Sequence, residues 1–193
     1  MAVLKEALTI DISTLHLKES QFYALCLSNE ALRFELTAQG ELIVMSPVGG
    51  ESGNREAGLN AKVWIWNEQT QLGQVFSSST IFQLPSGAKR SPDVAWVAQA
   101  RWLNLTPEQR KKFPPIAPDF VIELRSETDD LATLQAKMCE YLNNGVRLGW
   151  LLNPQDQQVE IYQTGSEAKI LELPAQLSGE NVLLGFTLDL SRF

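Results

Sequence analysis

The segment APDFVIELRS, residues 117–126, constrains the fold most, because it places a carboxylate inside a stretch with the pattern of a buried strand. Between Phe120 and Leu124 every residue except Glu123 is apolar, which is typical of a central strand covered on both faces. Burial of an unpaired carboxylate is costly and raises its pKa. We therefore expect a cation, a metal ion or a group of hydrogen-bond donors beside Glu123.

Length and charge limit the class of protein. With 193 residues, 44% of them apolar, the chain can bury one substantial core, and we expect a single domain over residues 1–193. The net charge of −7 argues against nonspecific coating of nucleic acid, although a local basic groove is compatible with it. Basic residues cluster at 89–90 and 110–112, and each cluster alone is better explained as a solvated loop. The chain shows no bilayer-spanning run and no signal peptide, so we expect a cytoplasmic protein.

Several kinds of site are disfavoured by residue counts. The two cysteines, Cys26 and Cys139, are far apart in the sequence and indicate neither a disulfide framework nor a thiolate metal site. His16 is the only histidine, which excludes a histidine-cluster metal site. A serine hydrolase is a weak alternative, because the sequence has no G-x-S-x-G elbow.

The pattern of apolar residues and caps predicts an α/β or α+β domain. Helices are expected over residues 18–28, from 51 to a stop at Gly73, over 106–113 and over 130–144. Strands are expected in a hairpin around Gln39-Gly40, in GQVFSSS, IFQL, SPDVAWV, residues 119–124, RLGWLLN, QQVEIYQ, AKILEL and NVLLGFTLDL. This order predicts a central sheet flanked by helices, with an N-terminal hairpin and C-terminal strands added to it.

Asp93 is the acidic residue best placed to join Glu123. It begins the strand SPDVAWV, and carboxylates on neighbouring strands can share a divalent cation. Asp119 is four residues from Glu123 on the same strand, which at about 3.3 Å per residue puts it about 13 Å away.

Two basic residues could also accompany Glu123, and each has a structural explanation. Lys137 lies at the border of the apolar stripe of the 130–144 helix, where its stem could pack while the ammonium reaches water. Arg125 lies on the same strand face as Glu123 and could form a structural ion pair with it. For Lys137, geometry alone favours the structural explanation. For Arg125, the ion pair would explain a buried carboxylate without any chemistry.

A carboxylate at the start of one strand, a second 30 residues later and a basic residue two positions further on resemble the PD-(D/E)XK nuclease superfamily, with its restriction-endonuclease-like fold. Within it the chain most resembles the Uma family of restriction endonucleases. The likeness spans about residues 40–162. It is carried by GELIVMSPVGGESGN, SPDVAWV, PDFVIELRS, the KMCEYLNNG helix and LGWLLNP.

The resemblance implies a Mg²⁺ or Mn²⁺ site. Asp93 and Glu123 would be ligands together with the backbone carbonyl of Leu124, since oxygen ligands suit a hard cation. Glu51 matches an acidic residue that many members use as an additional ligand or water-mediated contact. A favourable interaction with the helix dipole explains Glu51 equally well.

The basic position departs from the superfamily pattern, which has lysine where this chain has Arg125. Arginine can hold a phosphate but cannot take a proton from water. The resemblance implies that the lysine has moved to the following helix, as Lys137. Asp93, Glu123, Lys137 and Arg125 are then the candidate catalytic residues.

The implied function is hydrolysis of DNA phosphodiester bonds by a metal-dependent endonuclease. The alternative is an inactive binding or assembly module that keeps the fold, with Glu123 and Arg125 paired as structure. Because double-strand cleavage by a small domain is easiest with one active site for each strand, we expect a homodimer.

Overall fold

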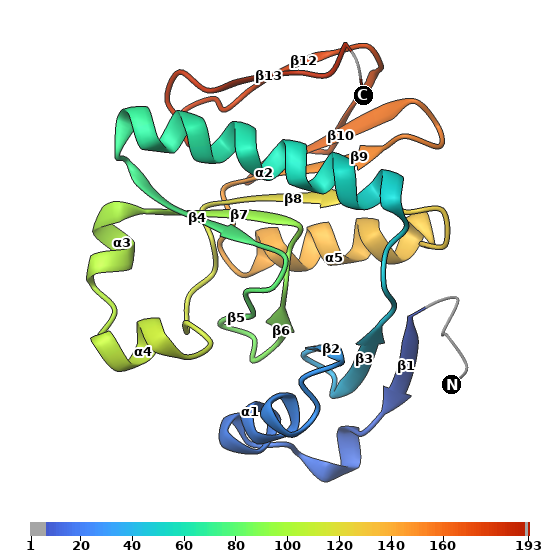
Figure 1. The fold of residues 1–193 in the computed structure, drawn as a ribbon, viewed down its shortest axis with the longest axis vertical. Helices are drawn as coiled ribbons and strands as arrows, with labels where there is room; N and C mark the ends of the chain where they lie inside the picture. The colour runs from blue at the N-terminus through green and yellow to red at the C-terminus, as the bar shows by residue number, and fades with distance from the viewer. Residues whose placement is uncertain (1–6, 192) are drawn as a thin grey trace.

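A six-stranded mixed sheet forms the centre of the computed structural model, which describes residues 7–191 and 193 (Figure 1). Its strand order is β11-β10-β9-β8-β7-β4. The strands are β4 (Gly73–Ser77), β7 (Val94–Ala98), β8 (Phe120–Leu124), β9 (Leu148–Asn153), β10 (Gln158–Gln163) and β11 (Lys169–Glu172). Only β8 and β9 are parallel neighbours, so the connection between them requires a crossover.

Two helices cover the two faces of this sheet. Helix α2 (Gly50–Thr70) lies on one face, and α5 (Leu131–Asn143), which makes the crossover from β8 to β9, lies on the other (Figure 1). Alternate side chains of β8 point to opposite faces. Phe120 and Ile122 pack with Leu59 of α2, whereas Val121 packs with Met138 of α5. Glu123 therefore emerges on the α5 face of a strand that is buried on both sides.

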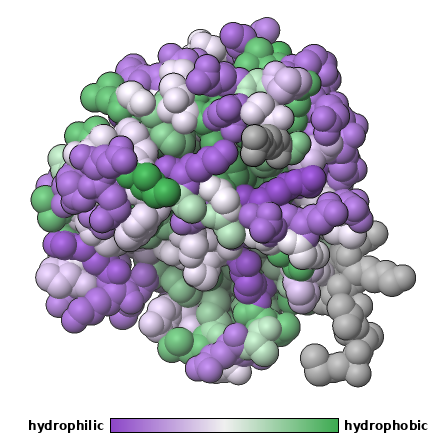
Figure 2. All heavy atoms as spheres, turned by 45° about the horizontal axis from the view of Figure 1, so that its top comes forward, coloured by the Kyte–Doolittle hydropathy of each residue, from purple (hydrophilic) through white to green (hydrophobic). Residues whose placement is uncertain are grey.

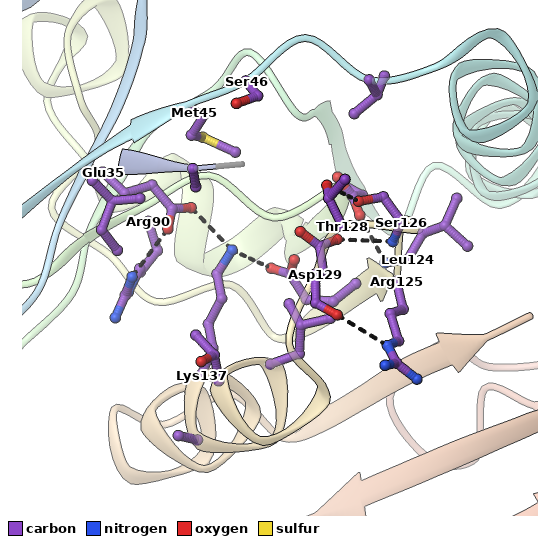
Figure 3. A pocket seen from close by; sticks show the side chains of 18 of the residues that line it. Glu35, Met45, Ser46, Arg90, Leu124, Arg125, Ser126, Thr128, Asp129 and Lys137 are labelled. Carbon is purple, nitrogen blue, oxygen red and sulfur yellow. Dashed lines mark hydrogen bonds and ion pairs between the residues drawn. The ribbon is translucent and has the colours of Figure 1, made fainter. Parts of the chain in front are cut away.

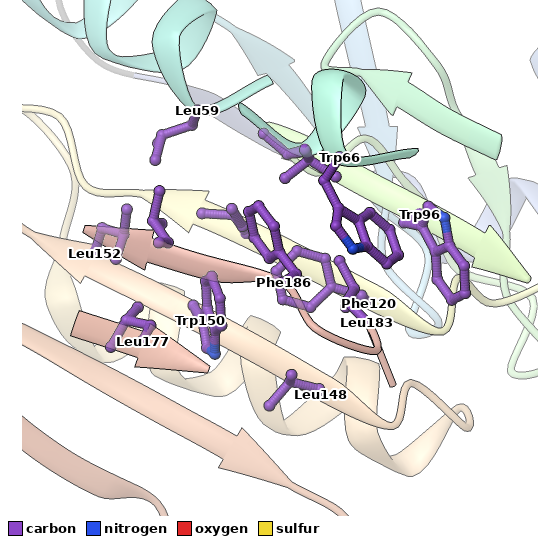
Figure 4. Packing of buried hydrophobic residues seen from close by; sticks show 14 of the residues in the cluster. Leu59, Trp66, Trp96, Phe120, Leu148, Trp150, Leu152, Leu177, Leu183 and Phe186 are labelled. Carbon is purple, nitrogen blue, oxygen red and sulfur yellow. The ribbon is translucent and has the colours of Figure 1, made fainter. Parts of the chain in front are cut away.

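An aromatic core fills the α2 side of the sheet (Figure 4). Phe120 and Trp150 meet edge to face with ring centroids 4.8 Å apart, and Trp66 of α2 lies 5.6 Å from Phe186. A two-stranded sheet of β12 (Gln176–Ser178) and β13 (Thr187–Asp189) covers this face and buries Leu177 in the same core. The core fixes the sheet from which the candidate site residues project.

A second, five-stranded sheet with order β1-β3-β2-β6-β5 packs beside the first. Its strands are β1 (Leu8–Asp11), β2 (Arg33–Leu36), β3 (Glu41–Met45), β5 (Phe82–Gln83) and β6 (Lys89–Arg90). Helix α1 (Glu19–Ser28) packs Phe22 against Phe34 and Leu36 of β2. The intervening Glu35 therefore points away from α1. Strand β6 continues through Ser91, Pro92 and Asp93 into β7 of the central sheet.

Three short helical segments complete the fold. A 3-10 turn spans Ser13–Leu15, and α3 spans Gln99–Leu103. Helix α4 (Pro107–Lys111) begins as the sequence predicts, because the Thr106 side chain accepts a hydrogen bond from the Gln109 N–H and Pro107 follows the cap.

The predicted fold class is confirmed, and two local predictions are wrong. The strand expected over NVLLGFTLDL is confined to β13, because residues 179–186 satisfy their backbone through successive turns instead. Helix α2 ends at Thr70, and Gln71 rather than Gly73 takes the left-handed cap conformation, with φ +52°. Gly73 instead begins β4, where a Cβ would lie 2.3 Å from the Val97 carbonyl oxygen.

The surface carries a mixture of polar and apolar residues. Figure 2 shows a face that is mostly hydrophilic, with hydrophobic residues in scattered groups. Across residues 7–191 and 193, none of the helices has the length and apolar character needed to cross a membrane.

Candidate active site

Asp93 and Glu123 lie side by side on neighbouring strands. Val94 of β7 pairs with Ile122 of β8 in an antiparallel register, so the next residues along, Asp93 and Glu123, face each other. Side chains directly opposite in such a pair have Cβ atoms about 4.5–5.5 Å apart. Asp93 Oδ2 also accepts a hydrogen bond from the Leu124 backbone N–H at 2.7 Å. The two carboxylates therefore share the α5 face of the sheet.

Helix α5 supplies the partners of Glu123. Asp130 caps the helix by accepting a 2.8 Å hydrogen bond from the Thr133 N–H, which sets the helical register that follows. One turn apart on the inner face, the Lys137 ammonium lies 2.9 Å from Glu123 Oε1 and the Tyr141 hydroxyl donates to the same oxygen at 2.8 Å. The cation expected beside Glu123 is thus Lys137.

The second sheet adds a carboxylate to the same cluster (Figure 3). Lys137 Nζ lies 3.0 Å from Glu35 Oε1, and Arg90 Nη1 lies 3.0 Å from Glu35 Oε2. Arg90 Nε in turn contacts Glu140 Oε2 at 2.5 Å. Acidic and basic groups therefore alternate from Glu123 through Lys137, Glu35 and Arg90 to Glu140. This chain of ion pairs ties the hairpin, the central sheet and α5 together.

The pKa values of Asp93, Glu123 and Lys137 are all raised, for different physical reasons. Burial and the negative charge of Glu123 raise the pKa of Asp93 well above its ordinary value, and Glu56 adds to the increase. Burial also raises the pKa of Glu123, although Lys137 opposes the rise. Burial alone would lower the pKa of Lys137, but Glu123 and Glu35 outweigh it and raise that pKa. Lys137 is therefore an ammonium at neutral pH.

The raised pKa of Asp93 also sets the sign of its contribution to stability. A carboxyl group whose pKa is higher in the folded state favours folding while it is protonated, and this stabilisation is lost as the pH rises through the folded-state pKa. Ionisation of Asp93 therefore adds repulsion between like charges beside Glu123. A bound cation would relieve that repulsion.

The donor set fits a hard divalent cation. The half-buried Asp93 and the buried Glu123 have raised pKa values, and the charge of Glu123 contributes to the rise at Asp93, so these carboxylates are oxygen donors that a positive ion would stabilise. Among residues 7–191 and 193, no three Asp, Glu, His or Cys side chains converge as an all-protein metal cage. A cation that keeps several waters and uses only one or two carboxylates, as Mg²⁺ does, suits this arrangement.

Glu51 lies farther from the cluster than a neighbouring acid that sequence reasoning missed. The Glu51 side chain in the first turn of α2 is 88% exposed, and its closest cation is Arg55 at 4.0 Å. Glu56 accepts a hydrogen bond from the Ser78 hydroxyl and adds to the raised pKa of Asp93. Glu56 precedes Leu59 by three residues and shares its helix face, a signal that could have identified it.

Arg125 is not paired with Glu123. Its guanidinium donates to the Asp129 carbonyl oxygen at 3.2 Å (Figure 3). It also donates to Asn153 Oδ1 at 3.2 Å and lies 2.9 Å from Asp156 Oδ2. The structural ion pair with Glu123 is therefore replaced by contacts at the end of β9. The snorkelling alternative for Lys137 is also wrong, because its side chain is only 11% exposed.

These residues line one wide cavity of about 1310 Å³. Its walls come from β2 and β3, the start of α2, the inner face of α5 and the loop after β8. Asp93, Glu123, Leu124, Arg125 and Lys137 all contribute to the lining, as does Glu51 at its exposed side. The lining holds nine acidic against four basic residues, so the cavity attracts cations.

Comparison with known proteins identifies relatives in sequence and in fold. The model of the family Uma2, described as "Putative restriction endonuclease", matches residues 19–191. A crystal structure from Anabaena variabilis ATCC 29413, described as "a putative nuclease belonging to DUF820", superposes with a TM-score of 0.69 at 17% sequence identity. The match covers 81% of this chain and 87% of that one. No curated protein matches the chain.

Proposed function

Because the chain belongs to the Uma2 family and has the fold of the PD-(D/E)XK nuclease superfamily, we propose that it is a metal-dependent endonuclease acting on DNA. The observation that carries the proposal is the pair of facing carboxylates, Asp93 immediately before β7 and Glu123 on β8, with Lys137 in contact with Glu123. The charge of Glu123 opposes ionisation of Asp93, and a metal ion bound between them would offset that repulsion.

In the proposed mechanism Asp93 and Glu123 would hold a Mg²⁺ or Mn²⁺ ion. The ion would supply an activated water and neutralise charge on the scissile phosphate. The Leu124 carbonyl is a further candidate ligand. Glu51 and Glu56, on α2, also line the cavity and are further candidates to hold a water molecule beside the ion.

Lys137 acts in this proposal as a fixed positive charge. Its raised pKa favours the ammonium form, so it orients the attacking water and stabilises the developing negative charge rather than accepting the proton. Glu35 holds the ammonium from the other side at 3.0 Å. Arg125 lies at the rim of the same cavity and can contact a neighbouring phosphate.

A homodimer is the assembly that we propose for double-strand cleavage. Asp93 and Glu123 would form one active site in each chain, and one such site would cut one strand. A two-fold arrangement would present two such sites to the two antiparallel strands of a duplex.

An inactive module with the same fold is the competing function. It is favoured by one observation, that Lys137 and Tyr141 already satisfy Glu123 Oε1 without a metal ion. Under this alternative the cluster would hold the two sheets and α5 together and perform no chemistry.

Incubation of the pure protein with supercoiled, linear and single-stranded DNA, each with Mn²⁺ and with chelator, separates the two functions. We expect nicking of supercoiled DNA that requires Mn²⁺ and disappears in Asp93→Asn. The variant is a matched control, because it keeps the side-chain shape and removes a charge that is unfavourable for the metal-free fold. Nicking that survives both chelator and the Asp93→Asn change would show a contaminating or unrelated activity and contradict the proposal.

A further inference from the structure

A second cavity, of about 590 Å³, lies between α1, α4 and the second sheet. This volume is within the range of pockets that bind small ligands. Aromatic rings form much of its wall: Tyr23 and Phe113 meet edge to face at 5.0 Å, and Phe76 and Trp102 lie 5.0 Å apart. These four rings are only half-buried and leave aromatic surface accessible from the cavity.

The charge of this cavity is opposite to that of the candidate active site. Its lining holds four basic residues, Arg33, Arg110, Lys111 and Lys112, against a single acid, Glu30. In a chain with a net charge of −7, this is a local reversal of sign. The active-site cavity, with nine acids and four bases, would repel a phosphate backbone unless metal ions are bound. Binding of a polyanion therefore needs a positive surface elsewhere.

The basic side chains are available to a ligand. Within the described part of the chain, none of the four forms an ion pair, and Lys111 and Lys112 are exposed. Lys112 Nζ lies 5.8 Å from the centre of the Tyr23 ring, so a positive charge stands beside an aromatic face. Arg110 is fixed in part by a 3.0 Å hydrogen bond from its Nε to the Leu105 carbonyl oxygen.

The two cavities adjoin each other. Met45 lines both of them, and β2 separates them, with Glu35 lining the active-site cavity and Phe34 lining the second cavity. Ser78 connects the two sides, because its carbonyl oxygen accepts a hydrogen bond from Arg33 and its hydroxyl donates to Glu56. A ligand that occupies the second cavity is therefore close to the candidate metal site.

We propose that the second cavity binds one nucleotide of a single nucleic acid strand, with its base stacked on Tyr23 or Phe113 and its phosphate at Arg110–Lys112. Aromatic rings beside a basic rim are the combination that binds single strands without sequence preference, because every base has a π-face and every linkage a negative charge. The inference rests on the proposed function only in taking nucleic acid as the polyanion.

Binding of a fluorescein-labelled dT₁₂ oligonucleotide to the protein in chelator, followed by fluorescence anisotropy over a range of salt concentrations, tests the proposal. We expect Tyr23→Ala to weaken binding by about 5-fold to 150-fold, with Tyr23→Phe close to wild type. The double change Lys111→Ala/Lys112→Ala should reduce the slope of log K against log salt by about 0.7 for each phosphate that the two lysines neutralise. Melting curves of each variant establish that the protein is folded.

The matched control is Lys62→Ala/Lys169→Ala, which removes the same charge from exposed positions outside this cavity. Equal loss of affinity in the control and in Lys111→Ala/Lys112→Ala would contradict the proposal, because binding would then follow net charge alone. Loss of affinity in Lys111→Ala/Lys112→Ala without any effect of Tyr23→Ala would also contradict the proposal, since the oligonucleotide would then lie on the outside of α4. Failure of the proposed function is a separate result, namely binding in chelator without cleavage in Mn²⁺.

Discussion

Lys137→Met should lower the free energy of unfolding of the metal-free protein by about 3–5 kcal/mol at pH 7, the cost of removing one partner from a buried ion pair. The ammonium lies between Glu35 and Glu123, at 3.0 and 2.9 Å, and all three side chains are largely buried. Arg90 still compensates Glu35 in the variant, but Glu123 keeps only the Tyr141 hydroxyl. Chemical denaturation in chelator measures the change.

The pH dependence of this loss has a defined sign. Burial already raises the pKa of Glu123, and removal of the ammonium should raise it further. A carboxyl group with a raised folded-state pKa favours folding when protonated, so the deficit should shrink as the pH falls from 7 towards 5. Adding Glu123→Gln to Lys137→Met should restore part of the stability at pH 7.

Lys169→Met is the control, because Lys169 is exposed on the edge strand β11 and its loss should change stability by about 0.5 kcal/mol or less. A similarly small effect of Lys137→Met would mean that its ammonium reaches water in solution and that the chain of ion pairs does not hold the two sheets together.

Substitutions of Lys137 and of Arg125 should have very different effects on the rate of DNA cleavage. We expect Lys137→Met to reduce Mn²⁺-dependent nicking by about 10²-fold or more, because a preorganised charge at the reacting phosphate is lost. Arg125→Lys should keep a large part of the activity, since the positive charge persists at the cavity rim and Arg125 does not contact Glu123. Initial nicking rates at a temperature where circular dichroism shows both variants folded give the comparison.

The opposite ranking, an active Lys137→Met protein and an inactive Arg125→Lys protein, would assign the chemical role to Arg125, which follows β8. Lys137 would then be a structural cation, as the alternative of an inactive module requires. Lys169→Met serves again as the control for loss of one lysine from the chain.

The arrangement of Asp93 and Glu123 could be predicted from sequence because both lie on strands whose apolar pattern is unambiguous. The run around Glu123 predicts a strand buried on both faces, and β8 is buried along its whole length. Helix α5 was also predictable, since Asp130 caps it and apolar residues repeat along one face. The helix pattern placed Lys137 only at the border of the apolar stripe, and its role beside Glu123 was implied by the family resemblance.

Glu35 could not be predicted as a member of the cluster. Its strand has the sequence Arg-Phe-Glu-Leu, in which polar and apolar residues alternate. This alternation is typical of a hairpin with one exposed face, and it predicts that the polar residues face water. The structure instead packs that face against the central sheet, where Arg90 and Lys137 compensate the carboxylate. Such a contact depends on how two sheets meet, and local periodicity carries no information about it.

The prediction of a strand over NVLLGFTLDL was wrong for a related reason. Val182, Leu183 and Phe186 are as apolar as strand residues, but they enter the core from turns. Burial explains their hydrophobicity in either conformation, so the pattern alone could not distinguish a strand from a buried loop.

Binding of Mn²⁺ to the unmodified protein and to Asp93→Asn, followed by electron paramagnetic resonance or calorimetry at the same pH, tests the metal centre most directly. The arrangement of Asp93 and Glu123 predicts one bound Mn²⁺ per chain and an affinity at least about tenfold lower in Asp93→Asn, since loss of even an outer-shell partner costs that much. Equal affinity in the two proteins, or no binding to either, would contradict a metal-dependent nuclease centred on these two carboxylates.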